Sequence, residues 1–306
     1  MGRIQLKPGL SGFLRLLVIA VLIALLLVLV PSGAIHSYAE LLTLPMDESG
    51  GVVPHEWAYT GNTAYEDPSL SVRIEQGRFL DTDWTSVSIK AANPTQVRTL
   101  KAGPYGSTRE AKGSVLAARV NAVLAIGGDF FTYHNYGYIV RQGQFYRNKP
   151  TGKQDVLVID DKGDLHVLLK ADRAMIEAFE KEHRDSIVNA FTFGPALMDK
   201  GQPVTLSADT KSDVVKAQRI ALCQTDELEY MVVYCEGPND VNSKGLSILQ
   251  FQELVASFPG VITAYNLDGG SSATIVFQGE KINGPRSQRS RSIGDIIYFA
   301  SVYKPD

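Results

Sequence analysis

The pattern of hydrophobic and polar positions divides the chain into three parts. Residues 16–30 are uninterrupted apolar, with basic residues before them and proline and glycine after them. Residues 43–68 are rich in proline, glycine and acidic side chains and show no period, which is typical of a linker. Beyond them, short apolar or alternating runs follow one another as β-strands do. The pattern predicts an export segment over 1–39, a spacer over 40–68 and one folded domain over 69–306.

The apolar run is short for a membrane span, because a spanning helix needs about 20 residues. Including Phe13 and Leu14 brings it near the lower limit, with Arg15 reaching the interface. Ser37 and Ala39 offer a small-x-small site for a signal peptidase. A cleaved signal peptide and an uncleaved membrane anchor both remain open. In either case the basic amino end predicts an extracytoplasmic domain, secreted or anchored to the membrane by this segment.

The folded part is predicted to be an α+β domain with mixed or antiparallel β-sheets and a few packed helices. Hairpins are indicated by Gly143 and by "DDKGD" at residues 160–164. Helices are predicted over 107–120, where Ser107 and Glu110 have capping-box spacing, over 172–183, and over 247–258. Strands are predicted at 71–75, 85–91, 122–126, 156–159, 165–169, 188–193, 218–223, 230–235, 261–266, 273–278 and 296–302.

Composition narrows the choice of partners. Lys and Arg number 30 against 33 for Asp and Glu, so the net charge of −3 argues against a nucleic-acid partner. The two cysteines, Cys223 and Cys235, lie in neighbouring apolar runs of a predicted hairpin. Their distances from the turn do not match, so direct pairing would need a bulge. Two buried thiols are favoured, and a disulfide stays open.

The stretch "NLDGGSS" places a carboxylate, two glycines and two hydroxyls at the end of the strand predicted at 261–266. Adjacent glycines let the backbone adopt left-handed angles and approach a ligand closely. The Asp268 carboxylate would then lie at the mouth of the strand, beside the hydroxyls of Ser271 and Ser272. The same stretch is also typical of a hairpin turn in which Asp268 bonds only to nearby backbone.

The stretch "GGDFF" at residues 127–131 follows the same plan, with an apolar strand, two glycines and an acid, Asp129. Two carboxylates at strand ends suit acid/base cleavage of an acetal, because one gives a proton while the other stays ionised. Two unrelated turns would produce the same spacing. The pair therefore indicates a glycosidase only if the two acids meet in space.

Five stretches, "GGDFF", "TFGPALMDKGQPV", "QRIALCQ", "NLDGGSSATIVFQG" and "RSIGDIIYF", occur in a familiar order. In them the chain resembles the phosphodiester glycosidase family, the family of the mannose-6-phosphate uncovering enzyme, over about residues 71–302. The resemblance implies hydrolysis of the bond between a sugar's anomeric carbon and a phosphodiester, typically of α-linked N-acetylglucosamine 1-phosphate. Exported bacterial members are usually linked to envelope polysaccharide. A glycan or sugar-phosphate substrate is therefore expected, with no cofactor.

The resemblance also implies roles for individual residues. Asp268 and Asp129 would share acid, base or nucleophile duty, while Arg219 and Arg291 would hold the phosphodiester oxygens. The remaining positions that it implies for substrate binding are Asn266, Gly269, Gly270, Ser272, Phe130 and Gly194, the last in an FGP turn.

The chain departs from the family pattern at four positions. Gly127 stands where the family has asparagine, and Ile220, Cys223 and Ser271 replace threonine, glycine and glycine. These departures bear on how substrate is oriented more than on the fold.

His134, in "TYHNYGY", is a further candidate for protonating the leaving phosphate, although histidines beside tyrosines are more often scaffolding. Two rival functions remain. One is a non-catalytic glycan-binding or envelope assembly protein on the same fold. The other is a metal-dependent phosphodiesterase using Asp129, Asp268 and Glu236, against which the sequence shows no HxH, DxD or His-rich set.

Overall fold

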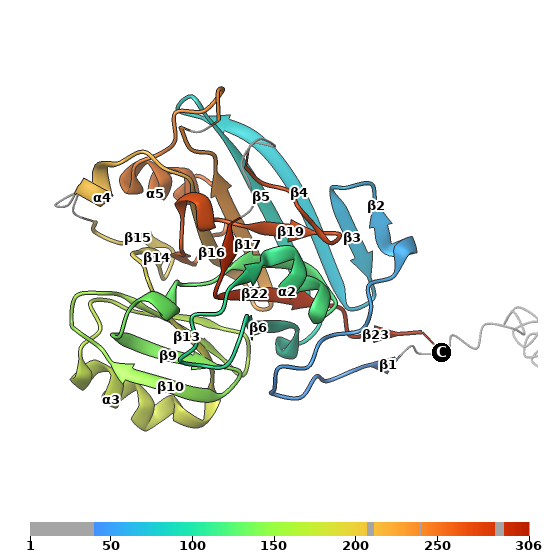
Figure 1. Ribbon diagram of the computed structural model, residues 1–306, viewed down its shortest axis with the longest axis horizontal. Helices are drawn as coiled ribbons and strands as arrows, with labels where there is room; N and C mark the ends of the chain where they lie inside the picture. The colour runs from blue at the N-terminus through green and yellow to red at the C-terminus, as the bar shows by residue number, and fades with distance from the viewer. Residues whose placement is uncertain (1–39, 207–210, 239, 285–290, 306) are drawn as a thin grey trace, which may run out of the picture. The chain divides into compact units, whose positions relative to one another are not determined.

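The computed structural model of the chain describes residues 40–206, 211–238, 240–284 and 291–305 (Figure 1). These residues form one compact unit, from Glu40 to Pro305. The predicted export segment lies outside the described residues. Within the described ranges, no helix has the length and apolar character needed to cross a lipid bilayer.

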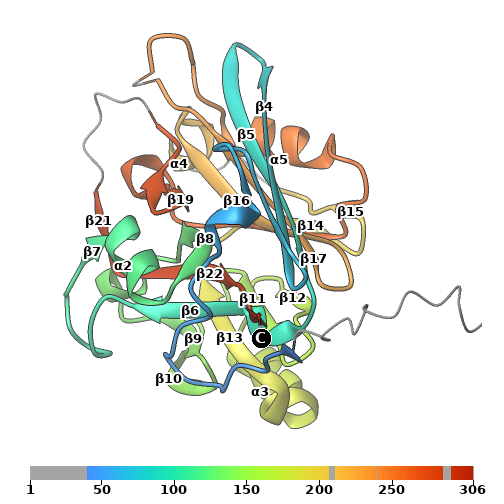
Figure 2. The same ribbon diagram turned by 90° about the vertical axis from the view of Figure 1, so that its right-hand side faces the viewer.

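The largest sheet has nine strands, and every strand pair in the described residues is antiparallel. Its long strands β4 and β5 form the hairpin seen in Figure 2. In spatial order the sheet contains β15 (Gln202–Pro203), β14 (Ala196–Asp199), β18 (Thr263–Asn266), β16 (Arg219–Asp226), β17 (Glu229–Cys235), β5 (Thr82–Ala91), β4 (Leu70–Phe79), β3 (Ala64–Asp67) and β2 (Tyr59–Thr60).

Two five-stranded sheets complete the framework. The first contains β20 (Glu280–Lys281), β19 (Ile275–Phe277), β8 (Ala122–Gly127), β22 (Asp295–Ala300) and β6 (Val97–Lys101). The second contains β10 (Gln144–Lys149), β9 (Gly137–Arg141), β13 (Ile187–Thr192), β11 (Val156–Asp160) and β12 (Leu165–Leu168). Two short ladders pair β1 (Glu40–Leu41) with β23 (Tyr303–Lys304) and β7 (Ala111–Lys112) with β21 (Ser292–Ile293).

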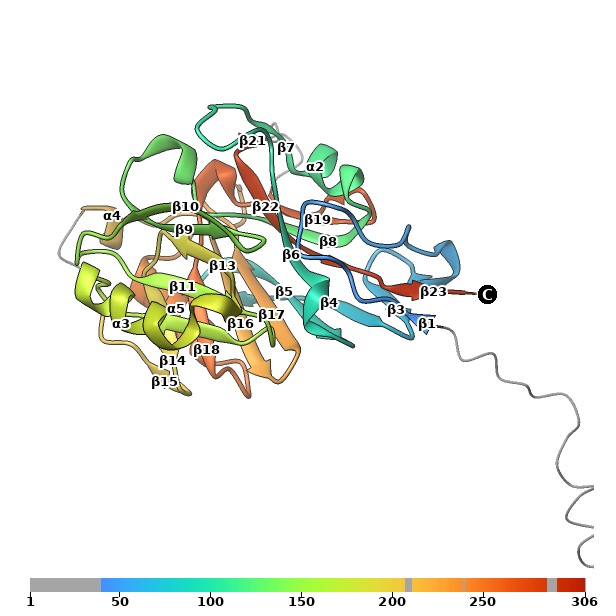
Figure 3. The same ribbon diagram turned by 90° about the horizontal axis from the view of Figure 1, so that it is seen from below.

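A central apolar core joins all three sheets, and each sheet is covered on its other face by a helix (Figures 1 and 3). The alternation along β17 shows why: Tyr230, Val232 and Tyr234 face the central core, while Val233 and Cys235 face α5. The α-helices of the described residues are α2 (Gly113–Arg119), α3 (Arg173–His183), α4 (Lys211–Val214) and α5 (Ile248–Ala256). Short 3-10 turns are η1 (Glu56–Ala58), η2 (Pro94–Gln96), η3 (Phe131–Tyr133), η4 (Arg184–Ser186) and η5 (Gly270–Ser272).

Three strand ends from two sheets meet at one point. The Gly128 N–H, just after β8, donates to the carbonyl of Asp295 at the start of β22 (3.3 Å). The Gly128 carbonyl in turn accepts the N–H of Asp268, which follows β18 (3.1 Å). The two stretches that sequence analysis singled out are therefore adjacent in space, although 139 residues separate Asp129 from Asp268 (268 − 129).

Most predicted elements agree with the structure, including both hairpins and the helix capped by Asp172, whose side chain accepts the N–H of Met175. The mixed-or-antiparallel expectation resolves to antiparallel throughout the described strands. The helix predicted over 107–120 is wrong in its first half, since α2 begins at Gly113. Residues 111 and 112 pair instead with β21, and Glu110 accepts a hydrogen bond from the Tyr133 hydroxyl (2.6 Å).

The predicted spacer also differs from the structure. Residues 40–68 belong to the same compact unit as the rest of the domain, and β2 and β3 extend the nine-stranded sheet. Tyr65 is fully buried, and its hydroxyl donates to Asp67 (2.6 Å). A few aromatic residues placed at sheet positions are enough to anchor a Pro- and Gly-rich stretch that lacks any period.

The cysteines provide a direct check on the sheet register. Both are buried free thiols, and they do not face each other, since Cys223 lies opposite Met231 and Cys235 opposite Arg219. Burial raises the pKa of the Cys235 thiol to about 12 and the pKa of the Cys223 thiol as well.

We expect a thiol reagent to label neither cysteine in the folded protein and both after denaturation. Fewer than two reactive thiols in non-reducing denaturant would contradict this register.

Candidate active site

Asp268 lies at the turn between β18 and η5, partly open to solvent. Burial raises the pKa of its carboxyl to about 6, against lowering by the Ser272 side chain and by the charge of Arg291. The charges of Asp129 and Asp295 add to the rise. Near neutral pH this carboxyl therefore exchanges a proton readily, as a general acid or base must.

A small space of about 10 Å³ lies against Asp268, large enough for about one water molecule. Gly127, Gly128 and Gly294 leave room for it, and three acidic residues are part of its lining. Its lining consists of Glu110, Gly127, Gly128, Phe130, Asp268, Ser272, Ser292, Ile293, Gly294 and Asp295.

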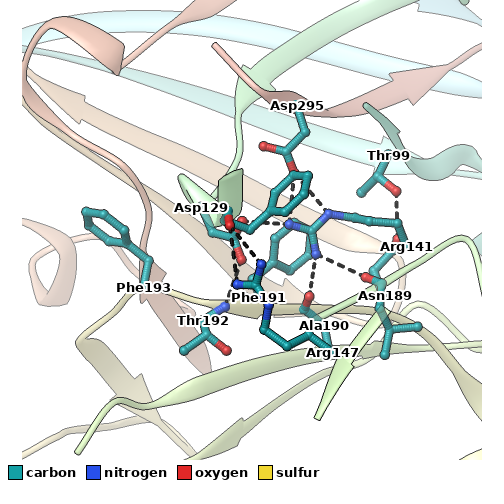
Figure 4. Close-up of polar contacts among 12 residues, drawn as sticks. Thr99, Asp129, Arg141, Arg147, Asn189, Ala190, Phe191, Thr192, Phe193 and Asp295 are labelled. Carbon is teal, nitrogen blue, oxygen red and sulfur yellow. Dashed lines mark hydrogen bonds and ion pairs between the residues drawn. The ribbon is translucent and has the colours of Figure 1, made fainter. Parts of the chain in front are cut away.

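A buried ion cluster lies beneath this space (Figure 4). The Arg141 guanidinium, on β9, donates through Nη2 to Asp129 Oδ1 (2.6 Å) and through Nε to Asp295 Oδ2 (2.9 Å). All three side chains are almost completely buried. One cation thus serves two carboxylates that come from a different sheet and from the loop after β8.

The Arg141 side chain is fixed on all sides. Its Nη1 donates to the carbonyls of Val140 (3.0 Å) and Ala190. Its guanidinium carbon lies 4.1 Å from the ring centre of Phe191 and 5.1 Å from that of Phe131. A guanidinium held this way satisfies its donors without water and keeps a single position.

Asp129 does not face the small space, which differs from the expected catalytic role. Its Oδ1 is bound by Arg141, and its Oδ2 accepts the N–H of Thr192 (2.8 Å). Its exposed fraction is 0%. A carboxylate with both oxygens engaged and no exposure cannot reach a substrate, so the structure makes Asp129 a supporting residue.

Asp295 and Arg141 were missed in the sequence. Asp295 lies in "RSIGDIIYF", the stretch that also contains Arg291. The signal for Arg141 is a single charge in the apolar run "GYIVRQ". Burying a charge without a partner is unfavourable. That anomaly predicts a buried partner, although it does not say which acid supplies it.

The structure brings Arg291 and Phe130 to Asp268. Arg291 Nη1 lies 3.5 Å from the Ser271 hydroxyl, and its charge acts on the Asp268 carboxyl. Phe130 adopts a left-handed backbone (φ 64°) and stacks on Tyr133 with ring centres 4.4 Å apart. The aromatic ring of Phe130 and the guanidinium of Arg291 therefore lie near the Asp268 carboxyl.

Arg219 is placed differently. Its backbone borders Gly269, but its guanidinium donates to the carbonyls of Leu246 and Val215, at 2.9 Å each. It shares a strand face with Ala221, which packs in the cluster around α5. These contacts support the segments next to α5, and the phosphate-binding role expected for Arg219 finds no support in them.

His134 is also part of the scaffold. Its Nδ1 lies 3.1 Å from the Tyr136 carbonyl and 3.2 Å from Arg147 Nη1, and its ring stacks on Tyr136. Burial, together with the Arg147 charge, lowers its pKa. A neutral histidine tied to an arginine is poorly suited to protonate a leaving phosphate.

The remaining motif residues shape the backbone around Asp268. The Asn266 amide donates to the Gly194 carbonyl (2.7 Å), which ties the FGP turn to β18. A Cβ on Gly269 would lie 2.7 Å from the Gln218 carbonyl oxygen, and Gly270 has a left-handed φ of 57°. Gly269 is therefore required by the close approach of Gln218, just before β16, and Gly270 by its left-handed backbone, independently of any substrate.

The residues considered for a metal do not gather. Glu236 accepts hydrogen bonds from the Tyr234 hydroxyl (2.8 Å) and the Gly284 N–H (2.9 Å). Among the described residues, no group of three or more His, Cys, Asp or Glu side chains is placed to hold a metal ion.

Comparison with known proteins supplies the wider context. The phosphodiester glycosidase family matches residues 120–300. The chain is 25% identical over 200 residues to the uncharacterized SPbeta prophage-derived protein YomE of Bacillus subtilis (strain 168), covering 63% of this chain. It spans only 30% of that relative's length.

Solved structures share the fold at low sequence identity. The catalytic domain of zebrafish N-acetylglucosamine-1-phosphodiester alpha-N-acetylglucosaminidase, auto-inhibited by its pro-peptide, is 19% identical with a TM-score of 0.61, covering 86% of this chain and 98% of that one. A hypothetical protein from Synechocystis is 16% identical (TM-score 0.50; coverage 75% and 62%). A putative exported protein from Burkholderia pseudomallei K96243 is 13% identical (TM-score 0.50; coverage 72% and 74%).

The ion cluster predicts a large stability effect. Replacing Arg141 with methionine leaves two buried carboxylates without their cation, so we expect the free energy of unfolding to fall by about 3–5 kcal/mol at pH 7. The control is Arg78→Met, which removes an exposed ion pair to Asp83 and should change it by less than about 1 kcal/mol. Chemical denaturation measures both. Equal effects of the two substitutions would contradict the role of Arg141.

Proposed function

Because the chain belongs to the phosphodiester glycosidase family, we propose that it hydrolyses a sugar 1-phosphodiester of the N-acetylglucosamine 1-phosphate type. The substrate on this proposal is part of an envelope polysaccharide or a related glycan. The likeness to the zebrafish catalytic domain supports the fold on which such a site is built.

The observation that carries the proposal is the state of Asp268. It lies after β18 and directly before Gly269 and Gly270, and it is partly exposed. The pKa of its carboxyl is raised to about 6. It also borders Arg291, whose guanidinium suits a phosphodiester oxygen. An acid that can donate a proton next to a cation that can hold phosphate matches the needs of this reaction.

In the proposed reaction Asp268 protonates the phosphate oxygen as the bond from that oxygen to the anomeric carbon breaks. A water molecule forms the new bond to the anomeric carbon, and the proton that it loses returns to the ionised carboxylate. The products are the free sugar and a phosphomonoester. Phosphate is a good leaving group, so its departure needs less proton transfer from the acid than the cleavage of an ordinary glycoside does.

Phe130 and Tyr133 provide the proposed surface for the sugar. Their stacked rings stand beside Asp268, and an aromatic face packs well against the C–H face of a pyranose. Arg291 would hold the phosphodiester through charge-assisted bonds, each contributing about 1–3 kcal/mol where water is excluded.

The proposal places the domain outside the cytoplasm. Its basis is the basic-then-apolar pattern of residues 3–30. A glycan of the envelope is then within reach of a domain that is either secreted or held at the membrane by its amino-terminal segment.

The activity test compares Asp268→Asn with the wild-type protein. We expect release of free N-acetylglucosamine from UDP-N-acetylglucosamine or a model diester to fall at least about 100-fold, because the amide cannot transfer the proton. Asp161→Asn, the same change at an exposed position, should keep wild-type turnover. Full turnover by Asp268→Asn would remove Asp268 from the mechanism. Binding of glycan by the wild type without any product would favour a glycan-binding protein instead.

The same substitution makes an independent prediction about stability. A carboxyl whose folded pKa is raised favours folding in its protonated form, so this contribution is present below about pH 4 and is lost as the pH rises through about 6. Asp268→Asn should therefore raise the free energy of unfolding at pH 7.5 by about 1–2 kcal/mol, allowing for partial solvent screening. At pH 4 it should leave the value nearly unchanged. Chemical denaturation at both pH values measures this, and a loss of stability at pH 7.5 would contradict the raised pKa.

A further inference from the structure

The ion cluster beneath Asp268 carries more negative than positive charge. Two carboxylates, Asp129 and Asp295, share the one guanidinium of Arg141. Lys101 also acts electrostatically on Asp295, but its ammonium is paired with Glu48. When both carboxyls are ionised, the buried cluster has one excess negative charge, which is unfavourable, and burial accordingly raises the pKa of Asp129 and of Asp295.

Backbone hydrogen bonds of Gly128 connect the cluster residue Asp295 to Asp268. The N–H of Gly128 donates to the Asp295 carbonyl, and its carbonyl accepts the N–H of Asp268. A Cβ at this position would lie 2.1 Å from Asp295 Oδ1, so only glycine lets that carboxylate come so close. The peptide units of Gly128 therefore fix the distance between Asp295 and Asp268.

Asp295 and Asp268 also border the same water-sized space, which Asp129 does not. Arg141 binds Oδ2 of Asp295 from the buried side. For Oδ1 of Asp295, no hydrogen bond to a described residue is found, and this oxygen lies toward Gly128. Oδ1 of Asp295 thus lies next to Gly128, which also lines the space.

We propose that Asp295, held by the guanidinium that it shares with Asp129, is a positioning residue that acts through Asp268 and keeps the proton of the site on it. This inference rests on the proposed function of Asp268. Asp295 and Asp268 border the same space, and burial raises the pKa of the Asp295 carboxyl to about 6 as well. When both carboxyls are ionised they repel each other, so the ionised form of Asp268 is disfavoured until substrate accepts its proton.

The charged groups around Asp268 act in both directions. Arg291, before β22, favours its ionised form, and the Ser272 hydroxyl does the same through a hydrogen bond. Asp129 and Asp295 favour the protonated form, and burial adds to them. Glu110, on the rim of the space, is engaged by the Tyr133 hydroxyl.

The test removes one charge of the cluster at a time. Asp295→Asn and Asp129→Asn each leave Arg141 with one carboxylate, so no buried charge loses its only partner. Each should move the alkaline limb of the pH profile of kcat/KM to lower pH by about half a unit or more, because the charge that opposes ionisation of Asp268 is gone.

Asp67→Asn is the matched control. Asp67 is a buried carboxylate that accepts hydrogen bonds from Tyr65, Ser69 and Ser301, away from Asp268. Its substitution should lower stability and leave the midpoint of the pH profile unchanged. If Asp295→Asn folds and also leaves that midpoint unchanged, the proposal is overturned.

A second measurement titrates the wild-type protein and needs one variant only, to assign the resonance. In protein labelled with ¹³C at the aspartate carboxyls, the Asp268 resonance is identified by its loss in Asp268→Asn. We expect it to titrate near pH 6, with resonances of the cluster carboxyls responding at the same midpoint. Titration of Asp268 at an ordinary value of about 4 would overturn the proposal. This readout needs no turnover, so a protein that shows the coupled titration but no hydrolysis would sink the proposed function alone.

Discussion

The buried guanidinium of Arg141 is the interaction on which the arrangement of the site depends. It comes from β9 in one five-stranded sheet and binds Asp295, at the start of β22 in the other, and Asp129 in the loop after β8. Sheets packed only through apolar side chains leave some freedom of sliding. Charge-assisted bonds with fixed directions remove that freedom where the strand ends meet.

Low dielectric makes this cluster both strong and demanding. Away from water, each bond to Arg141 is worth more, and each unpaired oxygen is more costly. The molecule meets this condition with backbone groups: the Thr192 N–H binds Asp129, and the Ala190 and Val140 carbonyls accept from Arg141. The same exclusion of water that strengthens the cluster lets its excess charge act on the Asp268 carboxyl. The packing of the Arg141 cluster and the protonation of Asp268 therefore depend on each other.

Glycine is required near Asp268 because neighbouring segments of the chain approach closely there. Gly128 lies against the Asp295 carboxylate, and Gly269 lies against the Gln218 carbonyl. The substitution of Gly127 for the asparagine found in the family belongs to the same setting, because a Cβ there would lie 3.2 Å from the Ser272 carbonyl oxygen. With no side chain at position 127, the small space beside Asp268 stays open.

The sequence by itself determined most strands, both hairpins, two of the long helices and the importance of the Asp268 turn, because periodicity and turn residues are local properties of the chain. It did not determine that residues 40–68 join the sheet, that α2 begins at Gly113, or that Arg219 points toward the segments near α5. Tertiary structure alone decided that Asp129 is buried and that Asp295 borders the space beside Asp268. The physical reason is that burial and charge pairing depend on which strands become neighbours, and that choice is made by contacts between residues far apart in the chain.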